Sequence, residues 1–201
     1  MDRSISDEAL MLSYARGDAE AFERLLERHR RPLFGYLCRI LKSRELAEDT
    51  FQEVFIRVMK ARSRYKMTAK FTTWLYRIAH NACVDALRRE SYRKTESLSK
   101  PKNNRDGAGL TLQDAIPSSN PGPDVEFDRR QFMETLKKCI GRLSPEQREV
   151  FVLRQYQNLP FREIARVTGT TESTVKSRMR YALKSLRNML VAENIVEGVT
   201  T

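Results

Sequence analysis

Residues 158–187 carry side chains whose types and spacing suit contact with a polyanion. Apolar residues recur at helical period on either side of Gly169, which predicts two helices with a tight turn between them. In the second helix, the face opposite the apolar stripe is basic and hydrophilic at about 100° per residue. That face and its flanks hold Lys176, Ser177, Arg178, Arg180, Tyr181 and Lys184. This pattern predicts a helix-turn-helix, although a surface helix that is merely solvated would also carry such charges.

Positive charge gathers in two blocks of the chain. The 201 residues have a formal net charge of +11 and an isoelectric point near 9.8. Residues 57–105 contain fourteen basic and three acidic side chains, and residues 160–190 contain seven and two. A generic soluble surface would interleave both signs. The two blocks therefore predict two separate contacts with a polyanion such as nucleic acid.

Several classes of protein do not fit this sequence. An apolar run of about 18 residues is absent, so we expect no membrane insertion. The first residues lack an apolar signal segment, and the three cysteines form no CxxC pair, which favours a reduced, cytoplasmic protein. His80 and Cys83 share a helix, but no second ligand pair accompanies them, so neither a metal nor another cofactor is expected. No paired carboxylates, activated nucleophile or phosphate loop indicates an enzyme.

The elements that must position these side chains are all predicted to be helices. Alternating strand patterns are absent, so the expected fold is all-α, with two helical domains joined by a flexible linker. The predicted helices span residues 5–16, 19–41, 44–62, 74–90, 126–141, 145–156, 161–168 and 171–190. The predicted division is a first domain at 1–92, a linker rich in Ser, Asn, Pro and Gly at 93–125, and a second domain at 126–201.

Particular residues are predicted to begin or disturb these helices. Ser43 and Ser144 are expected as N-caps, and Thr72 or Thr73 is expected to cap the helix that contains Trp74. Pro32 is predicted to kink or interrupt the second helix, because proline lacks the backbone N–H that a helix interior needs.

Two long motifs resemble the bacterial sigma factors, specifically the small extracytoplasmic-function group. DTFQEVFIRVMKA and FTTWLYRIAHNACVDALRR within residues 19–90 resemble the sigma-2 domain. LSPEQREVFVLRQYQNLPFREIARVTGTTESTVKSRMRYALKSLR within residues 132–190 resembles the sigma-4 domain. Both domains occur in the family's order and spacing, with only the linker between them. The resemblance implies a factor that binds core RNA polymerase and directs transcription initiation at promoter DNA.

The resemblance assigns DNA contacts to both basic blocks. The second helix of the helix-turn-helix matches the reader of the minus-35 element, with Lys176, Ser177, Arg178, Arg180, Tyr181 and Lys184 as candidates. Residues 64–89 match the part that opens the minus-10 element, where aromatic and basic side chains can trap a flipped base. The candidates there are Tyr65, Lys66, Lys70, Phe71, Trp74, Tyr76, Asn81, Asp85, Arg88 and Arg89. Trp74 equally suits a core anchor at the head of its helix.

The resemblance also implies protein partners. The helix at 44–62 matches the one that docks on the clamp helices of the largest polymerase subunit, through Asp49, Gln52, Glu53 and Phe55. By composition alone, a solvated acidic face is the simpler interpretation. Apolar residues near Val150, Phe151 and Leu186 are candidates for contact with the flap of the second-largest subunit. An anti-sigma factor, often a membrane protein, is a further expected partner and would hold the factor at the membrane.

An alternative interpretation is a stand-alone helix-turn-helix transcriptional regulator. Such a protein would not need the FTTWLYRIAHN block or the acidic docking helix. The two interpretations differ in whether specific promoter binding depends on core polymerase.

Overall fold

The computed structural model describes residues 5–67, 69–97 and 123–193, and every regular element in those ranges is helical. The elements are α1 (Asp7–Ala15), α2 (Ala19–Leu41), α3 (Arg44–Ala61), the 3-10 turn η1 (Arg62–Arg64), α4 (Phe71–Ser97), α5 (Pro123–Arg142), α6 (Pro145–Gln155), α7 (Phe161–Thr168) and α8 (Glu172–Ala192). The all-α prediction is confirmed. Most of the predicted linker lies outside the described residues.

Hydroxyl and carboxylate side chains cap most of these helices, as the sequence pattern predicts. Ser43 accepts a hydrogen bond from the Leu46 N–H, Ser144 from the Gln147 N–H, and Thr171 from the Thr174 N–H. Each cap is worth about 1 kcal/mol because it satisfies a backbone donor that the helix itself leaves unpaired. At the other end of α7, Gly169 takes a left-handed φ of 66°, which ends the helix at low steric cost.

Two predictions about the ends of α4 are wrong, and one of the two effects predicted for Pro32 is excluded. Helix α4 begins at Phe71, so Thr72 and Thr73 lie within its first turn instead of capping it. Helix α4 also runs to Ser97 instead of ending near residue 90, because residues 91–97 contain neither glycine nor proline to stop it. Helix α2 continues through Pro32, so the predicted interruption does not occur. Its apolar face packs against α1, α3 and α4, and this tertiary packing outweighs the local cost of proline.

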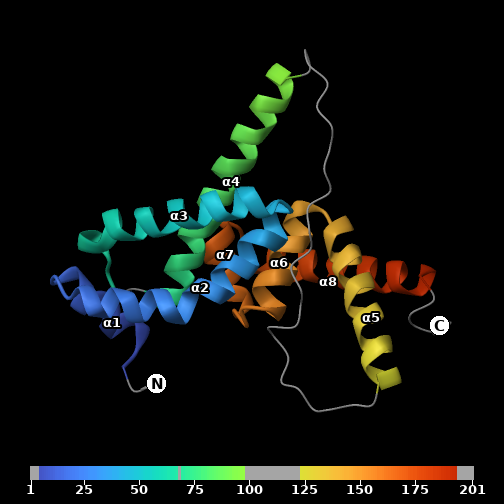
Figure 1. Ribbon diagram of the computed structural model, residues 1–201, viewed down its shortest axis with the longest axis horizontal. Helices are drawn as coiled ribbons and strands as arrows, with labels where there is room; N and C mark the ends of the chain where they lie inside the picture. Colours follow the sequence, from blue (N-terminus) through green and yellow to red (C-terminus); the bar gives the residue numbers. More distant parts are fainter. Residues whose placement is uncertain (1–4, 68, 98–122, 194–201) are drawn as a thin grey trace.

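The first helical unit, α1 to α4, is built around the apolar stripe of α2. Leu33, Tyr36 and Leu37 of that helix have no exposed surface. Helices α3 and α4 pack side by side against it and against each other. In Figure 1 the far end of α4 extends away from the body of the molecule, whereas its first half lies between α2 and α7.

The second unit, α5 to α8, places α6, α7 and α8 around a small apolar core. Val150 and Leu153 of α6, Ile164 of α7, and Val175 and Ala182 of α8 are all fully buried. Burial of the α8 stripe leaves the opposite, basic side of that helix facing outward.

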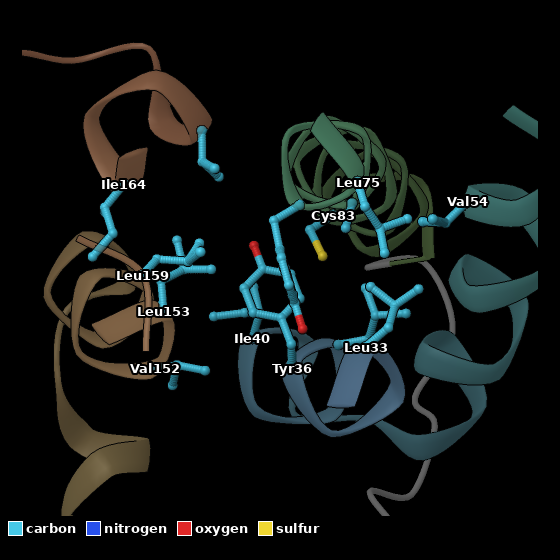
Figure 2. Close-up of a cluster of buried hydrophobic side chains, with 14 of the residues drawn as sticks. Leu33, Tyr36, Ile40, Val54, Leu75, Cys83, Val152, Leu153, Leu159 and Ile164 are labelled. Carbon is cyan, nitrogen blue, oxygen red and sulfur yellow. The ribbon is translucent and has the colours of Figure 1, made fainter. Parts of the chain in front are cut away.

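The two units pack directly on each other. Helix α4 lies against α7 and helix α2 lies against α6. Figure 2 shows Tyr36 and Ile40 of α2 beside Leu153 and Leu159 of the second unit, so the two cores join into one apolar cluster. We call this packing the closed arrangement.

Candidate nucleic-acid interface

The outer face of α8 presents its polar residues to solvent. Lys176, Ser177, Arg180, Tyr181 and Lys184 are exposed, and Arg178 is half-buried. The Arg180 guanidinium lies 5.2 Å from the centre of the Tyr181 ring, a cation–π contact that restrains both side chains. Lys176 forms an exposed ion pair with Glu172 at 2.7 Å, which water screens and which DNA phosphates can therefore displace.

The orientation of that face follows from local structure. The stripe of Val175, Met179, Ala182 and Leu186 is buried against α6 and α7, which fixes the rotation of α8 about its axis. Thr171 holds the first turn of α8 by accepting from the Thr174 N–H at 3.2 Å. The helix is therefore rigid at the end where recognition helices insert into the major groove.

Three aromatic rings cluster where the loop after η1 enters α4. The Tyr65 and Trp74 ring centres lie 5.0 Å apart, and those of Phe71 and Trp74 lie 5.8 Å apart. Tyr65 and Phe71 are buried, whereas Trp74 is half-buried against the core. Within the described residues, the buried Tyr65 hydroxyl has no hydrogen-bond partner, and burial raises the pKa of Tyr65 to about 12. Of the three rings, Trp74 alone retains substantial exposure in this arrangement.

In the closed arrangement, burial keeps both Phe71 and Tyr76 from contacting a base, which corrects their prediction as accessible side chains. Phe71 is 2% exposed and belongs to the core of the first unit, and Tyr76 is 2% exposed at the contact with the second unit. The apolar stripe of α4 continues through its aromatic residues, and sequence alone does not separate a stacking ring from a core ring. Phe71 supports the site from the core of the first unit, and Tyr76 supports it from the contact with the second unit.

The polar candidates of this region divide into two groups. Lys66, Lys70, Asn81 and Arg88 are exposed. Asp85 and Arg89 instead join a network between α3 and α4: Asp85 accepts from Arg57 at 2.7 Å, and Arg89 donates to Glu53 at 2.7 Å. These two hold α4 against α3, so their predicted contact with DNA would have to displace an ion pair.

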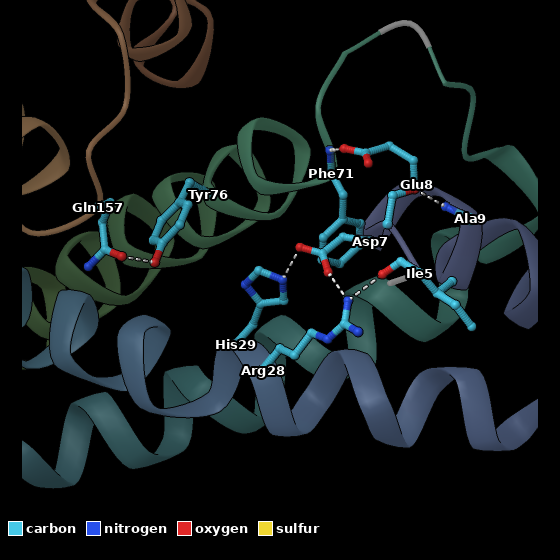
Figure 3. A network of polar contacts seen from close by, with 10 residues as sticks. Ile5, Asp7, Glu8, Ala9, Arg28, His29, Phe71, Tyr76 and Gln157 are labelled. Carbon is cyan, nitrogen blue, oxygen red and sulfur yellow. Dashed lines mark hydrogen bonds and ion pairs between the residues drawn. The ribbon is translucent and has the colours of Figure 1, made fainter. Parts of the chain in front are cut away.

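The first half of α4 carries a set of polar side chains that contact the second unit. We call Thr73, Tyr76 and His80 the interdomain face of α4. The Thr73 hydroxyl donates to Glu163 of α7 at 2.9 Å, and the Tyr76 hydroxyl donates to Gln157 at 2.5 Å (Figure 3). Because Tyr76 and Gln157 lie far apart in the sequence, no pattern along the chain predicts this contact.

The carboxylate of Glu149, in α6 of the second unit, contacts two residues of the first unit. Its Oε1 accepts from the Tyr36 hydroxyl at 2.6 Å and lies 2.7 Å from His80 Nδ1. The Glu149 side chain is only 12% exposed. The hydrogen bond from His80 to this carboxylate raises the pKa of His80. Burial raises the pKa of Tyr36 and of Cys83 beside it, so both stay neutral near pH 7.

Helix α3 presents a different kind of surface. Asp49 and Gln52 are exposed, whereas Glu53 is half-buried in its ion pairs with Arg57 and Arg89. Phe55 is 9% exposed and packs beneath the helix, so its prediction as a docking residue is corrected to a supporting role. The reason is that Phe55 lies on the same stripe as Val54 and Val58.

The sequence interpretation did not identify two exposed apolar residues on the outer face of α3. Ile56 is 44% exposed and Met59 is 40% exposed, one turn along from Gln52. Their spacing at i and i+3, away from the buried stripe, is the signal that identifies them. Exposed apolar side chains beside Asp49 and Gln52 suit a protein partner more than a solvated face.

The apolar candidates for the flap contact are buried. Val150, Phe151 and Leu186 are 0%, 7% and 4% exposed and form the core between α6 and α8. These three are therefore core residues, since a short three-helix core needs its largest apolar residues inside, and the predicted contact would have to use exposed residues near them.

The described residues lack the groups that a metal site or a membrane-spanning helix would need. Among the described residues, no group of three His, Cys, Asp or Glu side chains could hold a metal ion. His80 instead bonds Glu149, and the three cysteines are free thiols. No helix within the described ranges is both long and apolar enough to cross a membrane.

Comparisons with known proteins agree with the two-unit organisation. Sigma-70 region 2 matches residues 25–93, and Sigma-70 region 4 matches residues 133–186. The ECF RNA polymerase sigma factor SigK of Mycobacterium ulcerans (strain Agy99) is 31% identical over 192 residues, covering 94% of this chain and 96% of SigK. The RNA polymerase sigma factor CarQ of Myxococcus xanthus is 30% identical over 174 residues, covering 87% of this chain and 91% of CarQ.

Solved structures share the fold. The sigma factor RpoE in complex with the anti-sigma factor NepR, from Bartonella quintana, aligns with a TM-score of 0.67 at 20% identity, over 84% of this chain and 96% of RpoE. CnrH in complex with the cytosolic domain of CnrY aligns with a TM-score of 0.65 at 22% identity, over 94% of this chain and 99% of CnrH. With both regions matched in order and SigK matched over nearly its whole length, the chain belongs to the sigma-70 family, as an extracytoplasmic-function RNA polymerase sigma factor that directs transcription initiation.

Proposed function

We propose that this sigma factor uses three surfaces, two that bind promoter DNA and one that docks on core polymerase. The outer face of α8 reads the minus-35 element, with Arg180 as the principal base reader because arginine pairs bidentately with guanine. The exposed Lys66, Lys70, Asn81 and Arg88, together with the half-buried Trp74, open and hold the minus-10 element. The observation that carries this proposal is the exposed basic face of α8, set on a buried stripe within a helix-turn-helix.

The outer face of α3 is the proposed docking surface for core polymerase. Asp49 and Gln52 supply charge and hydrogen bonding, and the neighbouring Ile56 and Met59 supply exposed apolar area for a partner. The partner on this surface is the clamp-helix pair of the largest subunit. The second unit contacts the flap of the second-largest subunit through a surface other than Val150, Phe151 and Leu186.

The proposed domain division follows the two helical units. Residues 1–92 dock on polymerase and open the minus-10 element, residues 93–125 link, and residues 126–201 bind the minus-35 element. Helix α4 extends to Ser97 and α5 begins at Pro123, so the described helices overlap both ends of the proposed linker.

Promoter binding requires the closed arrangement to open. Two promoter elements about 17 base pairs apart lie about 55–60 Å apart along the duplex. In the closed arrangement α7 lies directly against α4, so the two units cannot occupy both elements while they stay in contact. The closed arrangement is accordingly the form that exists before polymerase and DNA are bound.

The protein acts in the cytoplasm without catalysing a reaction itself, and an anti-sigma factor controls it. Support for such a partner comes from RpoE and CnrH, which were each solved in a complex, RpoE with an anti-sigma factor and CnrH with the cytosolic domain of CnrY. The proposed partner would favour the closed arrangement and could itself lie at the membrane.

Reconstitution with core polymerase tests the proposal. Transcripts from genomic DNA should start at defined promoters when the purified protein is added to core polymerase, and the start sites should share two upstream elements. Binding of a specific duplex without polymerase, with no effect on transcription, would instead indicate a stand-alone regulator.

A further inference from the structure

Helix α1 lies outside the part of the chain that matches Sigma-70 region 2, yet it contacts the proposed strand-opening site. The family match begins at residue 25, whereas α1 spans Asp7–Ala15. It packs against α2, η1 and α4. Of its acidic side chains, Glu8 reaches the start of α4, and Asp7 reaches Arg28 and His29 of α2 (Figure 3).

Glu8 caps α4 from a separate element. Its Oε1 accepts a hydrogen bond from the Phe71 backbone N–H at 2.8 Å. The first turn of α4, from Phe71 to Trp74, contains no acidic residue of its own. The first backbone N–H groups of a helix lack partners within it and carry partial positive charge, so a carboxylate placed there stabilises the turn.

Asp7 contacts α2 next to the place where α4 begins. Its Oδ2 lies 2.7 Å from His29 Nε2, and its Oδ1 accepts from Arg28 at 2.9 Å. The His29 ring in turn packs against the Phe71 ring, with 5.2 Å between ring centres. The pKa of Asp7 is lowered, chiefly by the hydrogen bond from His29, so the carboxylate stays charged near pH 7.

The loop between η1 and α4 is therefore held at both ends by α1. At the η1 end, the Arg62 guanidinium lies 5.4 Å from the centre of the Tyr14 ring. At the α4 end, Glu8 holds the backbone of Phe71. Lys66 and Lys70 lie on the loop between these two points and are exposed. Lys70 directly precedes Phe71, so the Glu8 contact holds the backbone next to this cation.

We propose that Glu8 is a positioning residue for strand opening, because it fixes the first turn of α4 and with it Lys70 and Trp74. This inference rests on the proposed function of residues 65–89. A helix start that is fixed before the bases separate adds no ordering cost to the barrier for opening. Without the Glu8 carboxylate, that ordering must occur during opening and should slow it.

The experiment uses the full-length protein with core polymerase and two templates. One is a promoter duplex, and the other carries a mismatched, already open minus-10 segment at saturating concentration. Loss of one cap slows a step that depends on it by about tenfold. Glu8→Ala should therefore slow opening of the duplex by about tenfold and leave transcription from the mismatched template within about twofold of the wild-type rate.

Glu8→Gln is the conservative variant, and Glu23→Ala is the control for loss of an exposed acidic residue from the same unit. Because the amide oxygen still accepts from Phe71, Glu8→Gln should keep duplex opening within about threefold of wild type. Glu23→Ala should behave as wild type on both templates.

Two results would overturn the inference. One is an unchanged duplex opening rate in Glu8→Ala. The other is an equal loss on both templates together with weaker polymerase binding, which would show a general structural role. Failure of the wild-type protein to open the duplex would count against the proposed function of residues 65–89 instead, so the two failures are distinguishable.

Discussion

The outer face of α8 and the interdomain face of α4 belong to the two basic segments of the chain, yet the fold exposes the first and covers the second. On α8, Arg180 and Lys184 face solvent. On α4, Thr73 and Tyr76 are buried under α7 and the turn before it. The proposed reader of the upstream element is thus accessible while part of the strand-opening unit is covered. Charge along the chain predicts which segments contact DNA. Packing decides which of these segments is exposed to DNA while the arrangement is closed.

The hydrogen bonds also differ between the two faces. Those on α8 are local, as between Thr171 and Thr174, and survive any movement of the two units. Those on the interdomain face join residues more than sixty positions apart, such as His80 and Glu149, and exist only in the closed arrangement. Variants can therefore change one face without changing the other.

The largest expected effect is on the interdomain face. Glu149→Ala leaves the Tyr36 hydroxyl and His80 Nδ1 without their acceptor, at a cost of about 1–3 kcal/mol for each buried group. We expect the closed arrangement to be destabilised by about 2–4 kcal/mol and the radius of gyration in small-angle X-ray scattering to increase. Gln155→Ala, at an exposed position of the same helix, should leave the scattering unchanged. A compact Glu149→Ala variant of wild-type stability would contradict this account of the interface.

The next effect concerns the outer face of α8. Arg180→Ala should lose about 1–3 kcal/mol of discrimination at one upstream base pair, measured by promoter competition with the reconstituted holoenzyme. Lys184→Ala is the matched comparison, and it should weaken binding evenly across sequences as a phosphate contact does. Scattering of both variants should match wild type, since neither side chain lies at the interdomain contact. If Arg180→Ala kept its preference at every upstream position, Arg180 would not be a base reader.

A smaller effect is the pH dependence of the closed arrangement. The pKa of His80 is raised by its hydrogen bond to Glu149, so the charged imidazolium is favoured when the units are closed. This contribution is fully present below the ordinary histidine pKa of about 6.5 and is lost as pH rises through the raised value. The fraction of open molecules should thus grow as the pH is raised above the ordinary histidine pKa of about 6.5 in scattering measurements.

His80→Gln tests the origin of that pH dependence. Glu149 of α6 contacts His80, and the nearby Tyr36, Tyr76 and Cys83 stay neutral in this range because burial raises the pKa of each. Glutamine does not titrate, so the variant should show a flat profile. An unchanged slope would assign the dependence to another group.

The smallest effect on the fold is expected on the outer face of α3. Asp49→Ala combined with Gln52→Ala should change the free energy of unfolding by less than about 0.5 kcal/mol, because both side chains are exposed. Affinity for core polymerase should fall, as measured by competition with the wild-type protein. Glu27→Ala, an exposed acidic change on α2, controls for charge alone. Wild-type affinity of the double variant would remove these residues from the docking surface.

Helical periodicity and end signals predicted much of the local structure. The helix-turn-helix, its Gly169 turn, the Ser43 and Ser144 caps and the buried stripe of α8 follow from residue type and spacing. The Thr72 or Thr73 cap was wrong because the capping group, Glu8, comes from a distant helix. A local pattern contains no information about a cap supplied from outside it.

The sequence by itself determined the two helical units, the two basic blocks and the outward face of α8, since each depends on neighbours within one helix. Only the tertiary structure decided that Phe71, Tyr76 and Phe55 are buried, that Arg89 is held by Glu53, and that Glu149 joins α2 to α4. The physical reason is that an aromatic or charged residue suits either a surface or a buried contact. Which one it occupies depends on the element that packs against it, and that element is distant in the sequence.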